Sequence, residues 1–193
     1  MYQLLHTIHQ RNPSGIPWIS CVKNILCDAG FSGIWQTQSY PNSRWLKKAM
    51  NFKLRDIYIQ KWHEELNRSS DTNLYKYVRT TFSQSNYINI LPTQNCKSLL
   101  SFLTRNHRLP IELGRWQNIP YNERKCTSCN TLGDEYHYLM ECKELTSLRK
   151  KYIPKYYQSH PNFVKFIELL NSQQYDVLLN LSIFINKIIK TLH

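Results

Sequence analysis

Cys126-Thr127-Ser128-Cys129, followed by His137 and Cys142, is the stretch around which we read the rest of the chain. Its spacing is C-x2-C-x7-H-x4-C, and three thiolates with one imidazole form one of the closed tetrahedral ligand sets of structural zinc. The two-residue gap lets one tight turn present Cys126 and Cys129 to the same ion. The four-residue gap predicts that His137 and Cys142 reach the ion from a short turn or an irregular helix. We therefore predict one structural Zn²⁺ ion, bound by these four residues.

The alternative is a chance cluster of two thiols, an exposed histidine and a buried fourth cysteine. Three of the six cysteines fall within seventeen residues, however, and a disulfide would use only two of them. The remaining cysteines, Cys21, Cys27 and Cys96, lie among apolar residues, and we expect them to be buried as small hydrophobic side chains.

Composition and charge narrow the possible partners. The chain has 193 residues, of which 41% are hydrophobic, so it can bury a core as one large domain or two small ones. Its 25 Lys and Arg against 13 Asp and Glu give a net charge of +12. This charge favours a polyanionic partner, with nucleic acid ahead of a membrane surface, although a protein that is merely basic remains the alternative.

The sequence predicts neither a membrane span nor a signal peptide. No apolar run approaches the roughly 20 residues that cross a bilayer, and the start at 1–6 lacks a basic segment leading into an apolar one. We expect an intracellular protein, nuclear or cytoplasmic, with no membrane partner. Its thiols should therefore stay reduced, which favours metal binding over disulfides.

Apolar residues at three- and four-residue steps predict a mainly α fold, an irregular helical domain with a small Cys3His zinc-bound segment. The expected helices are 17–30, 42–67, 74–82, 93–106, 145–152, 163–170 and 177–192. We expect an irregular entry segment at 1–16, a loop around Ile34 and Trp35, and a possible short strand at 87–91. On the helix after Cys142, Arg149 should be exposed. The expected regions are an N-terminal helical region at 1–92, a zinc-binding segment at 93–160 and C-terminal helices at 161–193.

Basic and aromatic residues are interleaved just before and inside the cysteine motif. The candidate nucleic-acid contacts are Arg105, Arg108, Arg115, Trp116, Arg124 and Lys125. Their cationic groups would contact phosphates, while Trp116 and Tyr121 could stack on unpaired bases, which suits RNA or single strands better than duplex DNA. The alternative is that Trp116 belongs to the core and the arginines cap helices.

The same span resembles a known family. Asn106-His107-Arg108-Leu109-Pro110-Ile111-Glu112-Leu113-Gly114-Arg115-Trp116, then Arg124-x-Cys126-x-x-Cys129, then Gly133-Asp134-Glu135-Tyr136-His137 and Cys142, are similar to the zinc-binding region of reverse transcriptases. They look most like the C-terminal part of non-LTR (LINE-type) retrotransposon polyproteins. The resemblance implies that the four ligands match the family's metal site. It also implies that a polymerase domain precedes this region in a parent polyprotein.

The motif, the charge and the resemblance together are consistent with three functions. The first is a zinc-stabilised nucleic-acid-binding C-terminal fragment of a retrotransposon reverse transcriptase. It would lack polymerase activity and catalytic residues, because no Asp-Asp pair is present to hold two metal ions. The second is a structural or protein-interaction module that docks on a polymerase core. The third, an enzyme using Asp134, Glu135 and His137 around an open zinc, is disfavoured because four protein ligands leave no position for water.

Overall fold

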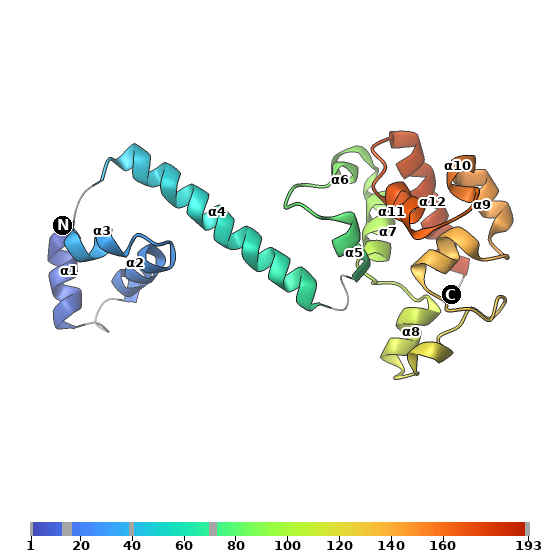
Figure 1. Cartoon of the computed structure of the whole chain (residues 1–193), viewed down its shortest axis with the longest axis horizontal. Helices are drawn as coiled ribbons and strands as arrows, with labels where there is room; N and C mark the ends of the chain where they lie inside the picture. The colour runs from blue at the N-terminus through green and yellow to red at the C-terminus, as the bar shows by residue number, and fades with distance from the viewer. Residues whose placement is uncertain (1, 13–16, 39–40, 70–72, 192–193) are drawn as a thin grey trace. The chain divides into compact units, whose positions relative to one another are not determined.

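The computed structural model of the chain describes residues 2–12, 17–38, 41–69 and 73–191 (Figure 1). These residues are mainly helical and contain no β-strand, only one isolated antiparallel bridge between Lys125 and Leu132. The mainly α fold with a Cys3His segment is therefore confirmed. None of the described helices is long and apolar enough to cross a lipid bilayer.

The chain divides into two compact units, residues 1–65 and residues 66–193. The first contains α1 (Tyr2–Arg11), α2 (Pro17–Asp28), α3 (Ser32–Thr37) and most of α4 (Ser43–Arg68). Its small core consists of Ile19, Leu26 and Trp35.

Three expectations for this first unit are corrected by the structure. The entry segment is a helix over Tyr2–Arg11, with residues 13–16 outside the described part of the chain. Trp35 lies on a short helix, where it is buried and makes an edge-on contact with the His6 ring at 4.9 Å between centroids. Cys21 and Cys27 are exposed, and neither belongs to the small core formed by Ile19, Leu26 and Trp35.

The long helix α4 matches the predicted range of 42–67 within a residue. The side chain of Asn42 begins it by accepting hydrogen bonds from the backbone amides of Arg44 and Trp45, at 3.0 and 3.2 Å. Its apolar stripe is not buried, however: Leu66 is the one buried side chain along the helix. Four large apolar residues remain exposed, namely Trp45, Phe52, Leu54 and Tyr58.

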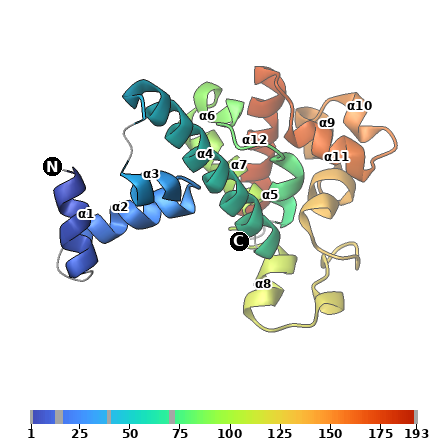
Figure 2. The ribbon, with the colours of Figure 1, turned by 60° about the vertical axis from the view of Figure 1, so that its left-hand side comes forward.

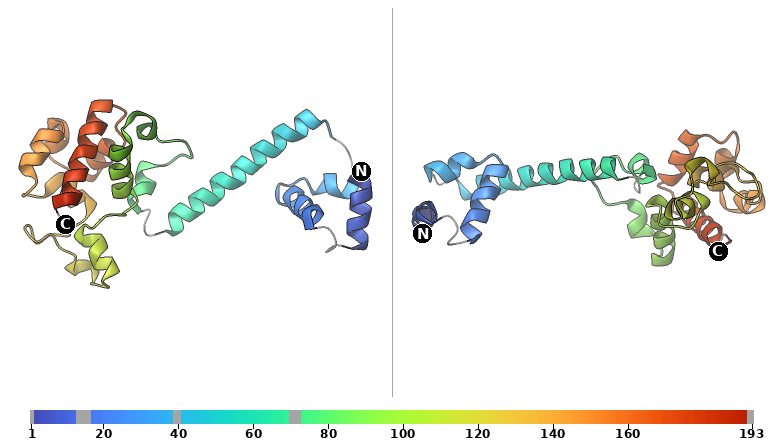
Figure 3. Two further views of the ribbon diagram at one scale, coloured as in Figure 1. Left: turned by 180° about the vertical axis from the view of Figure 1, so that it is seen from behind. Right: turned by 90° about the horizontal axis from the view of Figure 1, so that it is seen from below.

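The second unit holds the remaining helices. They are α5 (Asn73–Val78), α6 (Asn86–Ile90), α7 (Thr93–Leu103), α8 (Pro110–Trp116), η2 (Tyr121–Glu123), η3 (His137–Glu141), α9 (Thr146–Tyr152), α10 (Lys155–Gln158), α11 (Phe163–Leu170) and α12 (Tyr175–Thr191). The long apolar face of α12 packs between α7 and α9 (Figures 1 and 3). At the edge of this unit opposite α10 lies α8 (Figure 2).

One hydrophobic core runs through the second unit and includes residues on both sides of the expected boundaries at 92 and 160. Val78 and Tyr87 share this core with Phe102, Leu139 and Phe184. The apolar side chains of residues 74–91 therefore pack with the metal-site segment and the C-terminal helices.

The expected strand at 87–91 is a short helix, α6. A single strand would leave its backbone groups without a partner strand, whereas here the amide of Leu91 donates to the carbonyl of Tyr87 at 3.0 Å. Tyr87 is buried on this helix and belongs to the core of the second unit.

Candidate metal centre

The first two candidate ligands lie on a tight hairpin formed by residues 124–133. The amide of Cys126 donates to the carbonyl of Thr131 at 2.8 Å, and the amide of Gly133 donates to the carbonyl of Arg124 at 2.8 Å. At the tip, Asn130 has a φ of 54°, a left-handed conformation that asparagine tolerates better than most residues. The hairpin reverses the chain directly after Cys129, so both thiols face the same side.

The other two candidate ligands lie on η3, a turn of π-helix over His137–Glu141. The carboxylate of Asp134 caps its start by accepting a hydrogen bond from the His137 amide at 2.8 Å. The Cys142 amide donates to the His137 carbonyl at 2.8 Å, five residues back. In an α-helix of 3.6 residues per turn, side chains five positions apart would diverge by about 140°. The wider π turn brings them onto one face, as the predicted irregular helix requires.

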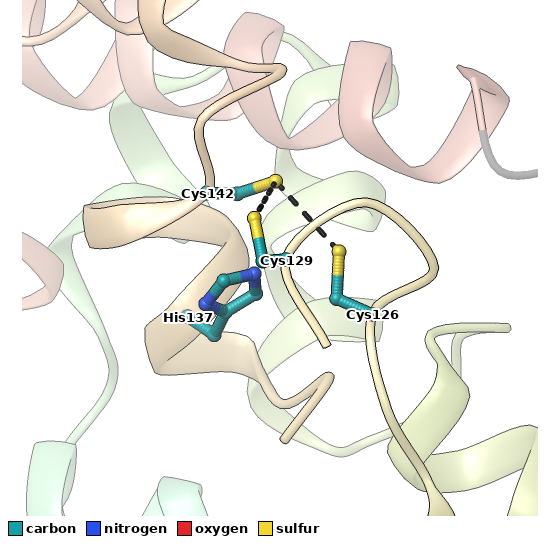
Figure 4. Close-up of side chains that lie close together, drawn as sticks. All are labelled: Cys126, Cys129, His137 and Cys142. Atoms are coloured by element: carbon teal, nitrogen blue, oxygen red, sulfur yellow. Dashed lines mark hydrogen bonds between the residues drawn. The ribbon is translucent and has the colours of Figure 1, made fainter. Parts of the chain in front are cut away.

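The ligand atoms of Cys126, Cys129, His137 and Cys142 all lie within 4.8 Å of one another and could hold one metal ion. Figure 4 shows the three sulfurs and one ring nitrogen of His137 facing a common centre. The Cys142 sulfur is 3.9 Å from the sulfurs of both Cys126 and Cys129. A tetrahedral centre with metal–sulfur bonds of about 2.3 Å has sulfurs roughly 3.8 Å apart, so this spacing fits. It is far longer than a disulfide bond of about 2.05 Å.

His137 carries the clearest sign of a ligand. Its ring lies buried, and its Nε2 has no hydrogen-bond partner among the described residues. An unsatisfied buried polar atom costs about 1–3 kcal/mol, so native proteins rarely leave one without a partner. The other nitrogen, Nδ1, lies 3.1 Å from the hydroxyl of Thr131. If Nδ1–H donates to this hydroxyl, Nε2 keeps its lone pair for a metal ion.

The thiols of Cys126 and Cys142 have pKa values that differ from the ordinary value in opposite directions. Burial opposes the ionisation of Cys126, but hydrogen bonds from the Tyr138 hydroxyl and the Cys129 amide outweigh it and lower the pKa of the Cys126 thiol. Burial raises the pKa of Cys142, and a thiolate at Cys126 raises it further. Such repulsion between neighbouring thiolates is what a bound cation relieves.

Arg149 closes the far side of this site and is buried, not exposed as expected. Its guanidinium donates to the carbonyls of Leu139 at 2.8 Å, Cys142 at 2.9 Å and Tyr138 at 3.4 Å. These carbonyls belong to the π turn and to the residue that follows it, so the arginine caps the end of the turn. Burial lowers the pKa of Arg149, while the nearby Cys142 thiol opposes that shift.

The surrounding motif residues pack against the hairpin. A Cβ on Gly133 would lie 2.8 Å from the ring of Pro110, so only glycine admits this contact. The Ile111 amide then donates to the Gly133 carbonyl at 3.1 Å, which joins the start of α8 to the hairpin. In the same way, a Cβ on Gly114 would lie 2.4 Å from the side chain of Arg124.

Two of the predicted nucleic-acid contacts pair with a buried carboxylate. Glu112 is fully buried on α8, with one oxygen 2.5 Å from Arg105 and the other 2.7 Å from Arg115. Arg105 itself ends α7 with a φ of 58°, and its side chain is only 13% exposed. Arg105 and Arg115 therefore both form ion pairs with Glu112 inside the protein.

Glu135 joins the loop after α7 to the segment that leads into the π turn. It accepts a hydrogen bond from His107 at 3.1 Å and lies 3.4 Å from Arg105. The Leu109 amide donates to the other nitrogen of His107, which leaves Nε2–H to donate to Glu135. Burial alone would raise the pKa of Glu135, but His107 and Arg105 outweigh it and lower the pKa.

The remaining predicted contacts differ in exposure. The guanidinium of Arg124 donates to the carbonyls of Ile119 at 2.9 Å and Ile111 at 3.3 Å, so it holds the end of α8. Arg108 and Lys125 are exposed, and Trp116 is 49% exposed, so its ring is not a core residue.

Sequence reasoning missed three residues that hold the ligands in place, Thr131, Tyr138 and Arg149. Each forms a hydrogen bond to another part of the site. Thr131 contacts His137, Tyr138 contacts Cys126, and Arg149 contacts the carbonyls of the π turn. Thr131 and Tyr138 lie between the first and last candidate ligands, so their positions in the sequence could have indicated a contact with the site. Arg149 lies in a run of three basic residues that carries no such signal.

No family model matches the chain, and comparisons with curated proteins and with solved structures found no similar protein.

Proposed function

We propose that the chain is a zinc-stabilised module that binds RNA or single-stranded DNA inside the cell, in the nucleus or the cytoplasm. Its motif resembles the C-terminal region of non-LTR retrotransposon reverse transcriptases, and we propose that origin, with no polymerase activity in this chain. A further partner in this proposal is the polymerase part of the parent polyprotein.

The observation that carries the metal part is the orphaned Nε2 of His137 beside three convergent sulfurs. Three sulfurs and one imidazole make a soft donor set, for which zinc is the usual redox-inert ion. Four protein ligands fill a tetrahedral zinc site, so the ion would have a structural role and leave no position for a reacting water.

The nucleic-acid part is supported by charge and exposure. Residues 66–193 carry 17 Lys and Arg against 9 Asp and Glu. Within residues 108–125, Arg108 and Lys125 are exposed, and the rings of Trp116 and Tyr121 are 49% and 57% exposed. Exposed cations and exposed aromatic rings in the same segment suit a single strand, whose phosphates and unstacked bases are both accessible. Arg105, Arg115 and Arg124 would contribute by holding this surface in shape.

The test is binding of a labelled single-stranded oligonucleotide at several salt concentrations. Replacing Arg108 and Lys125 by Ala should weaken binding and reduce the salt slope by about 0.7 for each lost phosphate contact. Trp116→Ala should cost roughly 1–3 kcal/mol of binding if its ring stacks on a base. Lys47→Ala with Lys48→Ala on α4 is the matched control. Equal losses from both pairs would indicate diffuse attraction and refute a defined contact surface.

A second candidate is a structural module that docks on a polymerase core, with zinc purely structural. It is favoured by the exposed apolar side chains of α4, where Phe52 is 70% exposed and Tyr58 is 58% exposed. If the wild-type protein showed no salt-dependent binding to RNA or single-stranded DNA, this candidate would replace the first.

A further inference from the structure

A polar and basic face lies along α7 and α12, away from the cysteine motif. Two adjoining cavities of about 340 and 250 Å³ open on it and share Gln94, Asn186 and Lys190. The full lining is Gln94, Asn95, Lys97, Ser98, Ser101, Ile183, Asn186, Lys187, Ile189 and Lys190, which we call the α7–α12 lysine face.

The residue spacing shows that each helix contributes one face. On α7 the lining positions 94, 97, 98 and 101 recur at helical steps, and on α12 the positions 183, 186, 187 and 190 do the same. The lysine face is therefore continuous across two packed helices.

Polar contacts between the helices fix the geometry of this face. Asn95 donates to the hydroxyl of Ser182 at 2.8 Å, and Asn186 donates to the hydroxyl of Ser98 at 2.9 Å. Ser182 is completely buried, so its contact is shielded from water. A surface that is already ordered loses little conformational entropy when a ligand binds to it.

The charge of this face has one sign. Lys97, Lys187 and Lys190 are exposed, and no carboxylate is among the described residues that line the two cavities. The sequence of α7 contains no acidic residue, and the only one in α12 is Asp176 in its first turn. This contrasts with Arg105 and Arg115, whose charges are offset by Glu112.

We propose that the α7–α12 lysine face binds the phosphates of a single-stranded nucleic acid, and this inference rests on the proposed function. Ammonium groups combined with hydroxyl and amide donors are a usual set of phosphate contacts. The lining contains no aromatic ring on which a base could stack, so the face would hold the backbone without reading sequence. Three lysines on a strongly basic unit favour a polyelectrolyte that releases counterions when it binds.

The experiment uses the full chain loaded with zinc and a labelled single-stranded oligonucleotide of mixed sequence. One variant carries Lys97→Gln, Lys187→Gln and Lys190→Gln. The matched control carries Lys143→Gln, Lys150→Gln and Lys155→Gln, which are exposed lysines of the same unit that line neither cavity. Both variants lose the same charge, and thermal unfolding with metal content checks that both remain folded.

The lysine-face variant should bind at least roughly tenfold more weakly at 0.1 M salt, with a salt slope smaller by about 2, because three single-strand contacts are lost. The control should change both quantities less. If the wild type binds and both variants weaken binding equally, the lysine face is not the phosphate-binding surface, but the proposed function remains supported. Absence of wild-type binding would overturn both.

A third arm tests the other polyanion that such a face could accept. Polyglutamate of matched charge is added as a competitor. If it displaces the oligonucleotide as effectively as unlabelled oligonucleotide does, and binds the lysine-face variant more weakly than wild type, the face recognises acidic peptide and the nucleic-acid assignment is overturned. Weak competition by polyglutamate supports the phosphate assignment.

Discussion

The two ring nitrogens of His137 have different surroundings, and this difference organises the candidate metal centre. Nδ1 lies 3.1 Å from the hydroxyl of Thr131, whereas Nε2 is buried and has no hydrogen-bond partner in the part of the chain that the structure describes. A hydrogen bond to the second nitrogen fixes the tautomer and ring orientation of a ligating histidine. Thr131 lies on the same hairpin as Cys126 and Cys129, so one hairpin supplies two ligands and orients a third.

Replacing Thr131 by Val removes the hydroxyl but keeps the shape of the side chain. We expect metal affinity to fall about 10–100-fold, the usual cost of losing an outer-shell partner. Competition with a chromophoric chelator measures this affinity. Thr127→Val, an exposed threonine on the same turn, is the control and should leave affinity unchanged. Equal affinities for the two variants would show that Thr131 does not orient His137.

Arg149 offers a second test at the scale of single residues. Arg149→Met should destabilise the metal-loaded protein by roughly 2 kcal/mol or more, because three buried carbonyls lose the hydrogen bonds that the guanidinium donates. Denaturant unfolding measures the change. Lys150→Met, its exposed neighbour, should stay within about 0.5 kcal/mol. If both substitutions cost the same, the arginine does not cap the π turn.

At the scale of elements, the π turn explains how residues five positions apart can both be ligands. Three contacts set it: Asp134 caps its start, the Cys142 amide reaches back to His137, and Arg149 holds its end. The sequence motif specified the four ligands and an irregular helix. It did not specify Arg149, because a guanidinium capping a distant turn leaves no local pattern in the sequence.

The same contrast holds for the helices. Long periodic segments were predictable, since α4, α11 and α12 each agree with the expected range to within a few residues. The short helices α3 and α6 were not predicted, although α9 was, because α3 and α6 bury Trp35 and Tyr87 in cores that the local sequence does not reveal. The predicted roles of Arg105 and Arg115 changed for a related reason, because their partner Glu112 is buried by tertiary packing.

Chelation should act on particular elements. We expect α8, the 124–133 hairpin and η3 to gain fast hydrogen exchange on metal removal, because an ion bound by the four candidate ligands would join the hairpin to the π turn. The α7–α12 pair should keep more of its protection, since their apolar faces and two interhelical hydrogen bonds do not involve the ligands. Hydrogen exchange with mass spectrometry measures both regions. Equal loss across the second unit would mean that the ion organises the entire core.

At the scale of the whole molecule, the chain consists of two units with separate cores. The candidate metal centre belongs entirely to the second, where Cys126 and Cys142 are part of the core itself. The net charge of +12 is shared by both units, so charge alone does not identify a contact surface.

This division predicts which fragments fold. A fragment of residues 66–193 should unfold cooperatively and bind one metal ion as the full chain does. A fragment of residues 93–193 should be markedly less stable, because it lacks the core residues Leu74, Val78, Tyr87 and Leu91. Thermal unfolding with metal analysis compares the two. Equal stability would favour the boundary at residue 92.

The most direct test of the central claim is the metal content of the full chain, purified under reducing conditions with zinc present and measured by native mass spectrometry and elemental analysis. We expect one zinc ion per chain, held much more weakly by a Cys142→Ser variant. A folded, reduced protein without bound zinc would contradict the claim, and so would one ion retained equally by the Cys142→Ser variant.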